Sequence, residues 1–87
     1  MEPNQLAELE LKIQQLIAQH FPAVESLSLQ AEDNLLESGA VDSLGLLLIV
    51  DLLETNFSIK VEDTDVVMEN FGSVRTLARY VQAKKGS

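Results

Sequence analysis

The sequence predicts a small all-α protein, a four-helix bundle with a short third helix and a long first loop. Two segments have apolar residues at helical spacing, and a third is apolar on nearly every side. One segment, "FSIKVED", has strand propensity, but no second strand is available to pair with it. A chain of 87 residues is expected to fold as one domain with one core, and a bundle is the fold that such helices build.

The first helix is expected from Asn4 to His20. Its apolar residues recur three or four positions apart, with polar residues on the opposite side. The Phe21-Pro22 step ends the helix, because a residue before proline avoids the α region. The expected apolar stripe consists of Leu6, Leu9, Ile13, Leu16 and Ile17.

A long loop follows, "FPAVESLSLQAEDNLLESGAVD", in which about twenty residues show no sustained period. Loops of this length are uncommon in a compact domain unless they pack against it or have a function. We therefore expect this loop to lie across the core, anchored by Val24, Leu27, Leu29, Leu35 and Leu36.

The second helix should run from about Ser43 to Asn56. Either Asp42 or Ser43 can cap it, because both side chains can accept a hydrogen bond from a free amide of the first turn. The helix has two apolar faces. The expected core stripe is Leu46, Ile49, Val50, Leu53 and Phe57, and Leu44, Leu47 and Leu48 lie to the other side.

A short third helix is predicted from Asp63 or Thr64 to about Glu69, where aspartates suit the positive end of the helix dipole. The fourth begins after "FGS", with Ser73 as its cap. Its apolar residues are Val74, Leu77, Ala78 and Val81, and Lys84 and Lys85 complement its C-terminal end. The whole chain, residues 1–87, is read as a single domain with frayed tails at 1–3 and 85–87.

The charge is large and unevenly distributed. The net charge is −8, and residues 32–69 hold ten of the 14 acidic residues with one basic residue. This argues against binding to nucleic acid or anionic lipid and favours a basic partner surface. The absence of cysteine excludes disulfides and thiolate metal sites. Without a signal-peptide pattern or a membrane-length apolar run, we expect a cytoplasmic protein. We also expect it to be a monomer.

The sequence around Ser43 does not fit that of a catalytic nucleophile. The hydrolase pattern G-x-S-x-G is only half present, because Val41 takes the place of the first glycine, and the single histidine, His20, ends the first helix. A calcium loop starting at "DTDVVMENFGSV" fails as well, since its sixth position is Met68 and not glycine. Neither an enzyme nor a metal site is expected, and a helix cap remains the plain interpretation of Ser43.

The wider context of Ser43 resembles the acyl carrier protein family. The segment "LLESGAVDSLGLLLIVDLLETNFSIKVEDTDVV" is similar to the modification site and second helix of that family, and "NFGSVRTLARYV" is similar to the start of its last helix. The resemblance covers essentially the whole chain. It implies an acyl-carrier-like bundle in which Ser43 carries 4'-phosphopantetheine, derived from coenzyme A, with Asp42 and Leu44 as flanking recognition residues.

The same resemblance implies a role without catalysis. A phosphodiester on Ser43 would lie at a helix N-terminus, which favours negative charge, and the arm would hold an activated acyl or aminoacyl group as a thioester. The implied partners are a phosphopantetheinyl transferase, an activating ligase and acyl-transferring enzymes with basic or apolar docking patches. The expected partner-binding residues are Leu44, Leu47, Leu48, Asp51 and Glu54.

The chain departs from fatty-acid carriers, which commonly have acidic residues two and five positions beyond the modified serine. Gly45 and Leu48 occupy those positions here. The sequence is more similar to discrete carriers, such as D-alanyl carriers or those of specialised pathways, and both positions are expected to face the partner. The alternative is a cofactor-free acidic helical module that keeps the carrier fold and binds a protein. The cargo, the pathway and the specific enzymes stay open.

Overall fold

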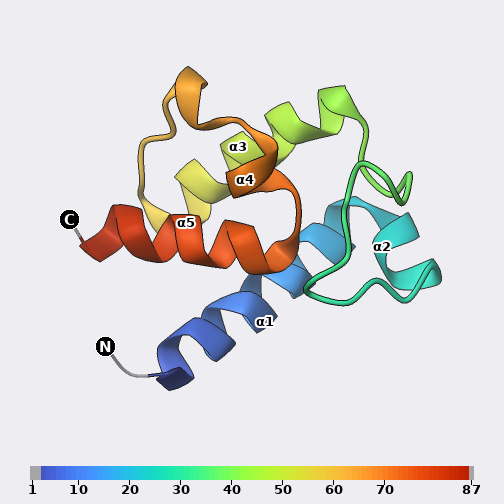
Figure 1. Cartoon of the computed structure of the whole chain (residues 1–87), viewed down its shortest axis with the longest axis horizontal. Coiled ribbons are helices and arrows are strands. Elements are labelled where there is room, and N and C mark those ends of the chain that lie inside the picture. Colours follow the sequence, from blue (N-terminus) through green and yellow to red (C-terminus); the bar gives the residue numbers. More distant parts are fainter. Residues whose placement is uncertain (1–2, 87) are drawn as a thin grey trace.

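Three long helices and three short helical turns follow one another along residues 3–86, the part of the chain that the computed structural model describes. They are α1 (Pro3–His20), α2 (Pro22–Ser26), α3 (Ser43–Phe57), the 3-10 turn η1 (Asp63–Asp65), α4 (Met68–Phe71) and α5 (Val74–Gly86). This part of the chain contains no strand, so the all-α prediction is confirmed. In Figure 1, α5 lies along α1 and against α4, and the two termini lie at the end opposite the long first loop.

The core lies between the three long helices and matches the predicted stripes. Each helix turns its regularly spaced apolar residues inward, because burying one such side chain contributes about 1.5 to 3 kcal/mol. Leu46 and Val50 are half-buried at the edge of this core. The fully buried positions include Ile13 and Ile17 of α1, Ile49 and Leu53 of α3, and Val74, Leu77, Ala78 and Val81 of α5.

The interruption between α1 and α2 is caused by Pro22. Phe21 leaves the helical region, with φ −131° and ψ 86°, and Pro22 then begins a new five-residue helix within the segment expected to be loop. Five residues are too few to show a period in the sequence. Ser28 takes a left-handed φ of 53° just beyond the end of α2, and Leu27 is left 53% exposed. The expectation that Leu27 anchors the loop is therefore wrong.

The rest of the first loop lies across the core, as predicted. The Gln14 side-chain amide donates to the Leu29 carbonyl at 2.9 Å, and the Arg75 backbone amide donates to the Ala31 carbonyl at 2.9 Å. The loop is thus tied to both α1 and α5. Of its expected anchors, Val24 and Leu35 are buried, and Leu29 and Leu36 are half-buried.

The predicted third helix is divided into two pieces. In place of one helix from Asp63 or Thr64 to Glu69, the chain forms η1, then an extended Val67 with φ −131° and ψ 163°, and then α4. Val67 is β-branched and accepts the first hydrogen bonds of α4 through its carbonyl. The extended step brings Phe71 into the core, where it is completely buried.

The cap of α5 is confirmed. The Ser73 hydroxyl accepts from the Thr76 amide at 3.2 Å, and the Thr76 hydroxyl accepts from the Ser73 amide at 3.1 Å. At the chain ends, where we expected frayed tails, Pro3 begins α1 and Lys85 and Gly86 belong to α5; residues 1, 2 and 87 lie outside the described residues. Among residues 3–86, no helix is both long enough and apolar enough to cross a membrane.

Candidate functional site

Asp42 caps α3, and Ser43 is the first residue inside the helix. The Asp42 backbone is extended, and its Oδ1 accepts a hydrogen bond from the Gly45 amide at 2.7 Å. The Asp42 carbonyl also accepts from the Leu46 amide at 3.2 Å. Of the two caps that the sequence left open, the structure therefore uses Asp42.

Ser43 is exposed, and among the described residues its hydroxyl has no hydrogen-bond partner. It lies at the positive end of a 15-residue helix, where an anion is stabilised by the free amides and the dipole. Because Asp42 does the capping, the Ser43 oxygen can be esterified without loss of a structural hydrogen bond. The surroundings of this hydroxyl therefore fit a covalent phosphodiester.

Gly45 is a buried residue in the first turn of α3. A methyl group added at its Cα would lie 2.8 Å from Phe21 Cε1 and 2.9 Å from Val41 Cγ1. The expectation that position 45 faces a partner is therefore wrong, because the glycine faces Phe21 and Val41 inside the protein. These two supporting residues could not be predicted from the sequence, in which the only local signal was a glycine inside an apolar helix.

The outer side of α3 carries exposed apolar residues, as predicted. Leu44 is 76% exposed, Leu47 63% and Leu48 38%, and we call these three residues the leucine face. Asp51 is exposed on the same helix. Apolar side chains that remain in water beside an exposed serine form a surface that a partner can cover.

Glu54 has a structural contact that the sequence did not indicate. Its Oε2 accepts a hydrogen bond from the Val61 amide at 2.9 Å, and its side chain is half-buried. This contact fixes the segment after α3, which turns at Ser58 with a left-handed φ of 55°. A role for Glu54 in partner binding stays a prediction.

A hydrogen bond and an ion pair hold η1 on α5. The Tyr80 hydroxyl donates to Asp65 Oδ2 at 2.7 Å, and Lys84 Nζ lies 3.7 Å from the same oxygen. The Tyr80 hydrogen bond, aided by Lys84, lowers the pKa of Asp65 against the effect of burial. Burial and the nearby carboxylates raise the pKa of Tyr80 above its usual range. Both pKa shifts therefore arise from burial and from contacts that hold η1 on α5.

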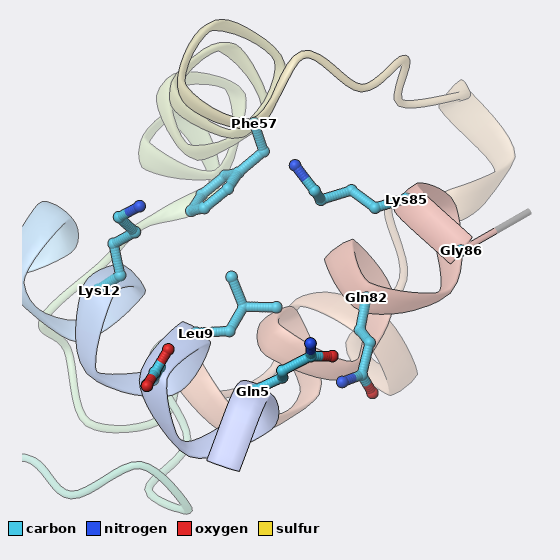
Figure 2. A pocket seen from close by; sticks show the side chains of 8 residues that line it. Gln5, Leu9, Lys12, Phe57, Gln82, Lys85 and Gly86 are labelled. Atoms are coloured by element: carbon cyan, nitrogen blue, oxygen red, sulfur yellow. The ribbon is translucent and has the colours of Figure 1, made fainter. Parts of the chain in front are cut away.

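A cleft of about 500 Å³ lies at the other end of α3 from Ser43. Figure 2 shows Leu9 and Phe57 facing each other across the cleft, with Lys12 and Lys85 on its sides. Phe57 is the last residue of α3, so roughly 20 Å of helix separates it from Ser43. The cleft shares no residue with the predicted site.

No catalytic or metal constellation accompanies Ser43 in the described part of the chain. His20 is exposed at the end of α1, and residues 3–86 contain no group of three or more His, Asp or Glu side chains able to hold a metal ion. A nucleophile activated within this chain would need a base beside its hydroxyl. The nearest carboxylate in sequence, Asp42, is already bonded to the helix amide.

Two comparisons bear on this site. The model of a family described as "Phosphopantetheine attachment site" matches residues 12–81, which include Ser43 and all three long helices in whole or in part. A comparison with curated proteins finds no significant match.

Proposed function

The chain belongs to the phosphopantetheine attachment-site family of carrier domains, and on that premise we propose that it is a discrete carrier which holds an activated acyl or aminoacyl group on Ser43. The cofactor of this family is covalently bound 4'-phosphopantetheine. When attached, the arm supplies a terminal thiol on which the cargo is held as a thioester. Domains of this family are typically carriers without catalytic activity of their own.

The observation that carries the assignment to Ser43 is its free, exposed hydroxyl at the capped start of α3. Asp42 already satisfies the Gly45 amide, so the Ser43 oxygen is the group that can be modified at no cost to the helix. A phosphodiester there would lie beside the positive end of the helix dipole. These features support Ser43 as the attachment residue.

The modification needs a base that accepts the proton of the Ser43 hydroxyl. In the transfer, the Ser43 oxygen forms a bond to phosphorus, and the pyrophosphate bond of coenzyme A breaks with adenosine bisphosphate as the leaving group. The serine proton passes to a base, which we expect the transferase to contribute. The carrier's part is to present the hydroxyl.

We assign partner docking to the leucine face together with the exposed acids Asp42 and Asp51. Burying a leucine in a partner's recess contributes about 1.5 to 3 kcal/mol, and the acids steer a basic partner toward the site. Partners with an apolar recess flanked by lysine or arginine fit this surface. They would include the transferase, an acyl- or aminoacyl-activating ligase and the enzymes that receive the cargo.

Intact mass spectrometry after incubation with coenzyme A and a promiscuous phosphopantetheinyl transferase tests the proposal. The expected result is a mass gain of one phosphopantetheine that fragmentation maps to Ser43. It should be absent in Ser43→Ala and present in the control Ser26→Ala, which removes another exposed hydroxyl. A wild-type protein that several active transferases leave unmodified would instead favour a cofactor-free module that binds a partner protein.

A further inference from the structure

We propose that Phe21 and Val41 are positioning residues for Ser43, and that they position it by packing against Gly45. The inference rests on the proposed function of Ser43 as the attachment residue. Phe21 lies between α1 and α2, and Val41 lies in the loop just before Asp42. The first turn of α3 is therefore held by two side chains from outside the helix.

The contact is close enough that a side chain at position 45 would force a neighbouring side chain to shift. A Cβ at position 45 would meet the Phe21 ring at 2.8 Å and a Val41 methyl at 2.9 Å, both shorter than van der Waals contact allows. Helix interiors disfavour glycine relative to alanine. A glycine at this position is explained by the approach of the two side chains and not by helix formation.

The same glycine also completes the cap. Its amide donates to Asp42 Oδ1 at 2.7 Å, so one residue both receives the Phe21 ring and closes the turn that contains Ser43. Phe21 is held in its own place, since its amide donates to the Ile17 carbonyl at 2.8 Å and its carbonyl accepts from the Val24 amide at 2.9 Å. A shift of Gly45 would therefore move the Ser43 hydroxyl relative to the body of the protein.

The contact also determines which side chains a partner can contact in the first turn of α3. Any side chain at position 45 would displace Phe21 or Val41, so no carboxylate can be presented there without rearrangement. A partner that covers the start of α3 meets Leu44 and the Asp42 carboxylate instead. The surface that a partner meets at the start of α3 is therefore formed by Leu44 and Asp42 and not by position 45.

The test is a set of methyl additions and matched removals. Gly45→Ala adds the obstructing methyl, and Gly45→Ala combined with Phe21→Leu or with Val41→Ala removes one of the two atoms that it meets. Gly86→Ala is the control, because nothing lies within 4 Å of a Cβ at that position. The measurements are kcat and KM for transfer of phosphopantetheine from coenzyme A, and hydrogen exchange of the backbone amide at position 45.

Gly45→Ala should lower kcat/KM by roughly 10- to 100-fold through kcat, because a misplaced reacting group slows the chemical step while the leucine face stays intact. Its position-45 amide should exchange faster. At least one double variant should recover most of both losses, and Gly86→Ala should match the wild type. If Gly45→Ala fails to fold, recovery of folding in a double variant supports the contact equally.

Two results would overturn the inference: a Gly45→Ala protein as active and as protected as the wild type, or a folded set of double variants with no recovery in either measurement. An unmodified wild type would instead contradict the proposed function. In that case the amide exchange and the thermal stability of the same variants still report on the contact, so the two failures are distinguishable.

Discussion

Substitutions at Asp42 and Ser43 should separate the residue that holds α3 from the residue that carries the function. Asp42→Ala removes a 2.7 Å hydrogen bond from a carboxylate to the Gly45 amide. Loss of an N-cap of this kind typically costs about 1 kcal/mol, within a range of roughly 0.5 to 2. For a domain of this size that corresponds to a fall in the melting temperature of about 4 to 8 °C.

The neighbouring substitution should behave differently. Ser43→Ala removes an exposed hydroxyl with no hydrogen-bond partner in the described part of the structure, so its cost should stay within about 0.5 kcal/mol. Asp42→Asn supplies an intermediate, because asparagine caps as well as aspartate but lacks the charge that favours a helix N-terminus, worth about 0.3 to 1 kcal/mol. The expected order of stability is wild type and Ser43→Ala, then Asp42→Asn, then Asp42→Ala.

Urea unfolding followed by far-ultraviolet circular dichroism measures this order, and the same four proteins can be tested for modification by mass. Ser43→Ala should be stable and unmodified, whereas Asp42→Asn should be modified at a reduced rate. The reasoning is refuted if Ser43→Ala is destabilised as much as Asp42→Ala, since the serine would then be part of the cap. It is also refuted if Asp42→Ala unfolds at the wild-type urea concentration.

Three further expectations concern partner docking and pH. Modification of the wild type should slow as salt rises, because exposed charges are screened, and Asp51→Lys should lower the association rate with little change in stability; equal rates at every salt concentration would remove electrostatics from docking. Leu44→Ala should weaken loading by a partner by about 1 to 2 kcal/mol, roughly 5- to 30-fold, whereas the control Leu27→Ala, at another exposed leucine, should not, and an equal effect of both would deny the leucine face a special role. Because its folded pKa is lowered chiefly by Tyr80, Asp65 adds stability that is present above the unfolded pKa of 3.8 and lost as pH falls below it; Tyr80→Phe should therefore show a shallower loss of urea stability on acidification, and an unchanged acid slope would contradict this role of the hydrogen bond.

The long helices could be predicted because each has local signals. In α3 the helical period alone separates Ile49 and Leu53, which are buried, from Leu44 and Leu47, which are exposed, although all four are apolar. Ser73 likewise indicates the start of α5, because serine is a preferred residue at a helix N-cap. Periodicity and caps are properties of neighbouring residues, so a sequence is sufficient to read them.

The supports of the candidate site could not be predicted in this way. The burial of Gly45 depends on Phe21, which is 24 positions earlier and lies between α1 and α2. The hydrogen bond from the Val61 amide to Glu54 depends on how the chain turns after α3. Both contacts join segments whose separation in space is set by the fold, and a charged or glycine residue gives no local sign of such a partner.

The exposed leucines of α3 would be a liability in a neutral protein. Apolar surface that is left in water invites association with any other apolar surface, including that of a second copy. Residues 32–69, which contain the leucine face, also carry a net charge of −9, so two copies that approach through this region repel each other. A basic partner is attracted by the same charges, and on contact it gains the apolar burial that a second copy is denied. The acidic residues around the leucine face therefore do not need individual contacts with a partner in order to matter, because their combined sign already selects which apolar surface can reach Ser43.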